Sequence, residues 1–233
     1  MSAKWDVPMR TDAYNARRYE NRVEWERGRH ATIGASEVSI ILGIAPKSWG
    51  NARDLWIDKT GRTALREDRE NADTVRGSRA EEHIRELFAI RHPDLKVYDG
   101  TNVIFRSKKY PWLSCSLDMV IEDERGNLYA GEIKDCRYTT HWKNGDYPLH
   151  YHYQCIAQLI VTGFSGVVLV PNISYSFGSG KFLDYIDGSS VVERHIVIRR
   201  SEVKSQFNGV IRETKKFHEC VISGREPEVV IMR

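Results

Sequence analysis

The sequence has few cysteines, and none of them stands at the spacing of a metal site. Four occur in 233 residues, none in a Cys-x-x-Cys motif: Cys115, Cys136, Cys155 and Cys220. This spacing argues against a disulfide framework and fits a reducing compartment such as the cytoplasm. The pair His150 and His152 has no further cysteine or histidine at a matching spacing, so we expect no zinc site.

Long apolar runs and a strong net charge are missing as well. No apolar stretch approaches membrane-spanning length, and the first residues, Met1-Ser-Ala-Lys-Trp-Asp, lack a signal-peptide pattern. We therefore expect no association with a membrane. The net charge of +3 neither indicates nor excludes nucleic-acid binding, because an acidic metal site and a phosphate-binding surface cancel in the sum.

The sequence does have enough apolar residues, 41% of 233, to bury one sizeable core. It contains no internal repeat, low-complexity tract or linker, so we predict a single domain over residues 1–233. A helical segment over about residues 1–60 is expected to pack on the core. The alternation of helix-like and strand-like segments predicts an α/β fold, with a mixed, twisted sheet flanked by helices.

Periodicity, caps and turn residues predict the individual elements. Helices are expected over residues 11–27, from Ser36 onward, and over 51–61, 73–91, 150–163 and 201–222. Strands are expected over 97–98, 103–106, 167–170 and 191–198. Residues 62–72 and 172–189 read as loops, and the basic and aromatic residues between Asp135 and Leu149 could follow a phosphate backbone.

The stretch from Ser114 to Lys134 predicts a β-hairpin, because two short strand-like segments flank the turn residues 124–127. With the pairing centred near Arg125, Asp118 lies opposite Glu132. Side chains alternate along a strand, so Lys134 shares the face of Glu132 while Ile133 points the other way. By the same period, Ser116 is expected on the face of Asp118.

Two carboxylates opposite one another destabilise a hairpin unless something lies between them. A divalent cation such as Mg²⁺ meets that need, because it takes carboxylate, carbonyl and water oxygens. The neighbouring Lys134 could then hold a water molecule or stabilise charge on a phosphate. The alternative is a solvated hairpin face, on which acids and lysines commonly alternate.

Two other places carry candidate functional side chains. Glu81 lies beside the apolar stripe of the helix at 73–91, where it is either a boundary residue reaching water or a further carboxylate for the hairpin site. Ser36 lies at a helix start, close in sequence to Arg29, and such a pair either binds a phosphate or is an ordinary cap beside a surface arginine.

These blocks together resemble a known family. The hairpin segments 110–118 and 129–134 resemble the core of the PD-(D/E)xK nuclease superfamily, with Leu117 in place of the usual proline. The order of blocks is more closely similar to the lambda exonuclease and YqaJ-type viral recombinase nucleases. The further blocks are Trp25…Arg29…Gly34-Ala35-Ser36, Leu55-Trp56…Lys59-Thr60-Gly61, Gly77-x-x-x-Glu81 and Pro148…Gln154…Gln158…Thr162-Gly163.

The resemblance implies a role for each matching residue. Asp118, Glu132 and the Ile133 carbonyl would hold one Mg²⁺, for which Mn²⁺ could substitute, and Glu81 would complete that ion or a second one. Lys134 would position or deprotonate a water molecule. The remaining matches are Gln154 at the active site, and Arg29, Ser36 and Ser116 around a 5′-terminal phosphate. Some superfamily members carry an iron–sulfur cluster on clustered cysteines, which this sequence lacks.

The activity implied by the resemblance is 5′-to-3′ digestion of one strand of linear double-stranded DNA. The product would be a 3′ single-stranded overhang for phage-type recombination, with a single-strand-annealing protein as partner. Relatives form a ring-shaped homotrimer, and the expected location is the cytoplasm of a bacterial host, from a phage or prophage gene. Two alternatives remain: an endonuclease on the same core, and a non-catalytic module that binds DNA ends.

Overall fold

The computed structural model of the chain describes residues 7–9, 11–62, 72–137, 146–177, 181–183 and 195–228. For residues 72–80, 135–137, 172–177 and 181–183 it describes the backbone alone. The predicted loop at 62–72 and the basic and aromatic segment between Asp135 and Leu149 therefore lie largely outside the described residues. The loop expected at 172–189 is wrong where the structure describes it, because residues 172–177 and 181–183 are strands that pair with each other and with a neighbouring strand. None of the helices within these ranges is long and apolar enough to cross a membrane.

The smaller of two sheets has the strand order β1 (Tyr14–Arg18), β4 (Val103–Ser107), β5 (Leu113–Cys115), β2 (Ile33–Gly34). The first three strands are antiparallel, and β2 runs parallel to β5. Residues 11–27 were expected to be helical throughout, and β1 corrects this for their first half. Tyr14 is fully buried there and the strand pairs with β4 over its whole length, a long-range contact that polar local composition does not reveal.

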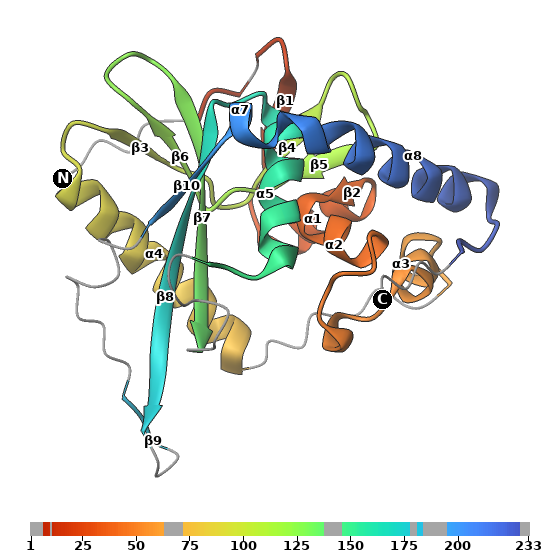
Figure 1. Ribbon diagram of the computed structural model, residues 1–233, viewed down its shortest axis with the longest axis horizontal. Helices are drawn as coiled ribbons and strands as arrows, with labels where there is room; N and C mark the ends of the chain where they lie inside the picture. The colour runs from red at the N-terminus through yellow and green to blue at the C-terminus, as the bar shows by residue number, and fades with distance from the viewer. Residues whose placement is uncertain are drawn as a thin grey trace.

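The larger sheet has the strand order β10 (Ile196–Arg199), β8 (Gly166–Phe177), β7 (Leu128–Arg137), β6 (Met119–Glu122), β3 (Lys96–Asp99), and β9 (Lys181–Leu183) pairs with β8. Strands β7 and β8 are parallel, and the other pairs are antiparallel. With helices on both sides of these strands (Figure 1), the predicted α/β class is confirmed.

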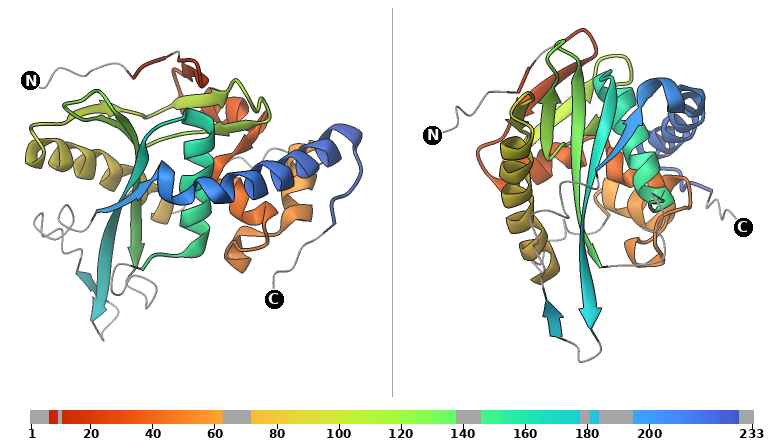
Figure 2. Two further views of the ribbon diagram at one scale, coloured as in Figure 1. Left: turned by 45° about the horizontal axis from the view of Figure 1, so that its top comes forward. Right: turned by 60° about the vertical axis from the view of Figure 1, so that its left-hand side comes forward.

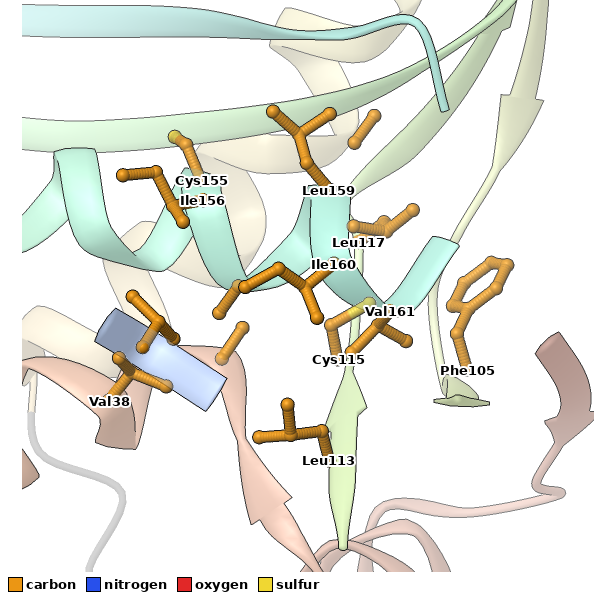
Figure 3. Close-up of a cluster of buried hydrophobic side chains, with 14 of the residues drawn as sticks. Val38, Phe105, Leu113, Cys115, Leu117, Cys155, Ile156, Leu159, Ile160 and Val161 are labelled. Atoms are coloured by element: carbon orange, nitrogen blue, oxygen red, sulfur yellow. The ribbon is translucent and has the colours of Figure 1, made fainter. Parts of the chain in front are cut away.

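Helices α4 (Ala72–Arg91) and α5 (Leu149–Thr162) lie on opposite sides of the larger sheet (Figure 2). On α4, Ile84 and Phe88 pack against the Ile133 side chain and its neighbours in the sheet. The other helix is buried over its second part, where Ile156, Leu159 and Val161 of α5 have no exposed surface. In the main core, which Figure 3 shows, they meet Phe105, Leu113 and Cys115 of the smaller sheet and Leu117, which follows β5.

The remaining helices cover the side of α5. In chain order they are α1 (Arg22–His30), η1 (Ala35–Glu37), α2 (Val38–Ile41), η2 (Lys47–Trp49), α3 (Ala52–Lys59), α7 (Arg200–Val203), η4 (Lys204–Gln206) and α8 (Phe207–Ser223). Asn51 caps α3, as its sequence predicts, by accepting hydrogen bonds from two backbone N–H groups. The helix expected over 201–222 is divided in three, because the backbone leaves the α-helical region at Val203.

Candidate active site

The hairpin of β6 and β7 has the predicted register. Met119 pairs with Gly131 and Glu122 with Leu128, so the pairing is centred on residue 125. Just beyond the paired residues, the Asp118 N–H donates to the Gly131 carbonyl at 3.2 Å. The Ile133 N–H donates to Asp118 Oδ2 at 2.6 Å, which fixes this carboxylate at the end of the hairpin beside Glu132.

The strand before the turn is interrupted, which corrects the expectation of a continuous strand from Ser114. Residues 116–118 are not in a strand, because the chain crosses there from β5 of the smaller sheet to β6 of the larger one. Gly100 allows this crossing, since a Cβ on it would stand 2.1 Å from the Leu117 carbonyl oxygen. Asp118 thus lies at the junction of the two sheets, where a cavity opens.

Glu132 lies at the centre of the site with only 4% of its surface exposed. Its Oε1 accepts hydrogen bonds from Lys134 Nζ at 2.5 Å and from Gln154 Nε2 at 2.6 Å. The amide of Gln158 donates to the other oxygen, Oε2. These donors hold a buried carboxylate that would otherwise be costly to desolvate. Gln158 was outside the expected set, although its spacing of four residues from Gln154 places both on one helical face.

Burial and neighbouring acids raise the pKa of two carboxyls of the site, Asp118 and Glu81. Burial raises the pKa of Asp118 well above its usual range, and the charges of Glu132 and Glu81 raise it further. For Glu81 the pKa is also raised, first by burial and then by Glu132. Burial alone would lower the pKa of Lys134, but Glu132 and Asp118 outweigh it and raise that pKa, so the lysine keeps its proton.

This donor set fits a hard divalent cation. The charge repulsion that raises the pKa of Asp118 and Glu81 is relieved when a cation shares the carboxylate oxygens. Within the described residues, no three Asp, Glu, His or Cys side chains are arranged to hold a metal ion by themselves. Besides carboxylate oxygens, Mg²⁺ readily accepts backbone carbonyl and water oxygens as ligands.

One cavity of about 340 Å³ brings the expected residues together. Its lining includes all eight side chains singled out from the sequence as catalytic, metal-binding or phosphate-binding: Arg29, Ser36, Glu81, Ser116, Asp118, Glu132, Lys134 and Gln154. The Ile133 side chain does not line the cavity, because it is packed under α4, while its backbone N–H bonds to Asp118.

Arg29 and Ser36 form a polar wall of this cavity. Arg29 Nη2 donates to Ser36 Oγ at 3.3 Å, and its guanidinium lies 4.7 Å from the centre of the Trp25 ring. Arg22 lies over the same ring at 4.2 Å. Ser36 is inside the first helical turn, and Gly34 is the residue that caps it. Ser116 Oγ is buried and has no hydrogen-bond partner among the described residues.

A buried lysine contacts the backbone of the segment that carries this wall. Lys59, with 4% of its side chain exposed, pairs with Glu37 at 2.9 Å. Its Nζ also donates to the Thr32 carbonyl at 2.8 Å and to that of Arg29 at 3.4 Å. Lys59 belongs to the block Leu55-Trp56…Lys59-Thr60-Gly61, which is part of the family resemblance but for which the sequence indicated no role.

Arg85 supports the other wall. Its Nη1 donates to the Asp118 carbonyl at 3.3 Å and pairs with Asp99 at 3.2 Å. Neither Arg85 nor Lys59 could be assigned from local spacing, since their partners are distant in sequence.

The fold matches that of a known nuclease. The crystal structure of an alkaline exonuclease (LHK-Exo) from Laribacter hongkongensis superposes with a TM-score of 0.62 at 18% identity, covering 88% of this chain and 95% of the other. The structure of the same enzyme in complex with dAMP gives the same values. At this identity the likeness establishes the fold, and the chain has the fold of that exonuclease.

The family follows from the sequence match. A model of the YqaJ-like viral recombinase domain matches residues 24–165, more than half of the chain, and the protein belongs to that family. An uncharacterized protein, YqaJ, of Bacillus subtilis (strain 168) is 30% identical over 148 residues, 61% of this chain. The match spans only 43% of that relative's length. Fold and family together support a nuclease.

Proposed function

We propose that the protein is a Mg²⁺-dependent exonuclease that digests one strand of linear double-stranded DNA from its 5′ end. The observation that carries the proposal is a single cavity lined by the acids Asp118, Glu132 and Glu81 together with Arg29 and Ser36. Acids that suit a divalent cation beside donors that suit a phosphate are what hydrolysis next to a terminal phosphate requires.

Each residue has a distinct task in this proposal. Asp118, Glu132, Glu81 and the Ile133 carbonyl would hold the cation, with Mn²⁺ able to replace Mg²⁺. When bound, the cation supplies charge stabilisation to the phosphodiester and lowers the pKa of a water molecule. Lys134 keeps its proton because Glu132 and Asp118 raise its pKa, so it would donate to the phosphate or the water rather than act as a base.

The glutamines and the donor wall orient the reacting groups. Gln154 and Gln158 hold the two oxygens of Glu132, which fixes the direction in which that carboxylate faces the cavity. Arg29 offers a planar fork of donors, Ser36 a hydroxyl beside it, and Ser116 a hydroxyl without a described protein partner. Together these groups would hold a 5′-terminal phosphate close to the acids.

End-labelled DNA tests the proposed activity. With linear duplex labelled at the 5′ or the 3′ end and Mg²⁺ present, we expect early release of the 5′ label as a mononucleotide and retention of the 3′ label. Without a divalent cation, neither label should be released. Cutting of closed circular duplex would favour an endonuclease, and binding of ends without release of any label would favour a non-catalytic module.

Arg29→Ala tests the proposed binding of the 5′-terminal phosphate. A hydrogen bond to a charged group contributes roughly 1.5–3 kcal/mol, so cleavage of 5′-phosphorylated duplex should fall about 10- to 100-fold. Duplex with a 5′ hydroxyl should be a slow substrate already, and the substitution should change its rate much less. Rates on both substrates are to be compared in parallel.

The matched control is Arg27→Ala, which removes the same charge from the exposed side of the same helix. It should affect both substrates alike, through general attraction to the backbone. Equal losses on both substrates in Arg29→Ala would make Arg29 a general contact or a structural residue.

The wider setting also belongs to this proposal. Family membership supports a role in phage-type recombination, with the 3′ overhang passed to a single-strand-annealing protein. A ring-shaped homotrimer around DNA would make digestion processive. Sedimentation of the purified protein at several concentrations, with and without duplex, tests the trimer independently of cleavage.

A further inference from the structure

Three aromatic side chains form a continuous series that runs from the candidate active site to the surface. Tyr151 contacts the site directly, since Lys134 Nζ lies 4.9 Å from the centre of its ring. The His150 ring is next, 4.1 Å from that of Tyr151, and the Trp49 ring lies 5.1 Å beyond His150. We call Trp49, His150 and Tyr151 the aromatic track.

The outer end of the track is exposed. Trp49 is 41% exposed and Leu149, the residue before His150, is 55% exposed. Isolated apolar residues on a surface need no explanation. Here, however, two distant segments of the chain, η2 and the start of α5, bring the rings of Trp49 and His150 together at the end of a series that begins at Lys134.

The turn that carries Trp49 is well defined. Its backbone N–H donates to the Pro46 carbonyl at 2.9 Å, and the Gly50 N–H donates to that of Lys47 at 3.2 Å. Gly50 has φ +84°, a conformation that glycine adopts without strain, and the Asn51 cap of α3 follows at once. With the backbone fixed in this way, only the side-chain torsions of Trp49 remain to be ordered when a ligand stacks on the ring.

The charge beside the ring indicates the kind of ligand. Lys47 is exposed and lies two residues from Trp49 in the same turn. An aromatic face next to a cation is the combination that binds single-stranded nucleic acid, because bases stack on the ring while phosphates pair with the cation. In an intact duplex, neighbouring base pairs already cover the base faces.

We propose that the aromatic track binds unpaired nucleobases of DNA next to the candidate active site, with Trp49 as the outer stacking platform. The choice of DNA as ligand rests on the proposed function. The track would hold the single strand that exists only after an end has been opened or digested. It therefore favours DNA with a single-stranded tail over blunt duplex.

Binding can be tested without cleavage by measuring fluorescence anisotropy in the presence of EDTA. The probes are a duplex with a 3′ oligothymidine tail and the same duplex with a tail of abasic residues, which has the phosphates but no bases. For Trp49→Ala we expect the affinity for the thymidine tail to fall about 10-fold or more, to the level of the abasic tail. The affinity for the abasic tail should not change.

Two further variants identify the interaction. Trp49→Phe keeps an aromatic face and should retain most of the preference for thymidine, whereas Trp49→Leu keeps apolar surface only and should lose it. Ile222→Ala, which alters an exposed apolar side chain on α8, should bind as the wild type does. Unfolding temperatures within a degree or so of wild type would show that the variants are folded.

Three results would overturn the proposal. Trp49→Ala could bind both tails as the wild type does, or it could lose affinity equally for both, which would make Trp49 a contact to the backbone. Trp49→Leu could instead change the oligomeric state in sedimentation and leave DNA binding intact, which would make this surface a protein interface. Because the assay contains no divalent cation, its outcome is independent of whether the protein cleaves DNA.

Discussion

Asp118→Asn and Glu132→Gln are each expected to reduce DNA cleavage to the level of a protein-free control. Both substitutions keep the shape of the side chain and remove its charge, so an oxygen ligand for a hard cation is lost without a cavity being made. Binding to duplex DNA should be unchanged or tighter, since less negative charge faces the phosphates. Cleavage and binding are to be measured on the same linear duplex.

The metal-free unfolding temperature gives a second readout for Asp118→Asn. Burial and neighbouring acids raise the pKa of this carboxyl in the folded protein. A raised pKa means that the charged form destabilises the fold at every pH above the unfolded value, so the neutral asparagine should raise the unfolding temperature near pH 7. Added Mg²⁺ should then stabilise the wild type and have little effect on the variant.

Glu124→Gln is the matched control, because it removes the same charge from the exposed turn of the same hairpin. It should cleave DNA and respond to Mg²⁺ as the wild type does. Cleavage near the wild-type rate in both Asp118→Asn and Glu132→Gln would remove these acids from the metal site. Loss of the folded state in either would show a structural role.

The centre of the site could be predicted because its information is local. Asp118, Glu132 and Lys134 lie on one hairpin, and a turn at residues 124–127 fixes which residues face each other. Periodicity alone then brings two acids and a lysine together. The position of Glu81 beside them came from the family resemblance, since helical periodicity left it between solvent and site.

The supports of the site could not be predicted in the same way. Lys59 reaches the Arg29 carbonyl across 30 positions in sequence, and Arg85 reaches that of Asp118 across 33. Such contacts depend on how helices dock, which no local pattern encodes. The strand β1 and the crossing at residues 116–118 were missed for the same reason, because each depends on pairing with a distant strand.

The role of Gln158, unlike those of Lys59 and Arg85, could have been predicted from the sequence. A polar side chain one helical turn from Gln154, in the buried and largely apolar second part of α5, needs a buried partner. Glu132 is that partner, and it takes one glutamine on each oxygen. Buried amides in an apolar helix are therefore a useful sign of the carboxylate that they hold.

Lys134→Met is expected to lower the cleavage rate by about 100- to 1000-fold, the loss that follows removal of one donor to developing charge. Methionine keeps an unbranched stem that can still pack on the Tyr151 ring but cannot donate to a phosphate or a water molecule. Single-turnover rates at saturating Mg²⁺ measure the effect. Lys96→Met is the control, since Lys96 pairs with Glu122 on the same sheet.

The response to Mg²⁺ distinguishes a role of Lys134 in the reaction from a role in building the metal site. Its ammonium pairs with Glu132 at 2.5 Å, so it competes with a cation for that carboxylate. Removing it should leave the affinity for Mg²⁺ unchanged or make it tighter, as measured by the rise in unfolding temperature during a Mg²⁺ titration. A variant that loses both cleavage and the response to Mg²⁺ would show that Lys134 builds the metal site instead of acting on the DNA. A variant that cleaves at the wild-type rate would remove Lys134 from the reaction.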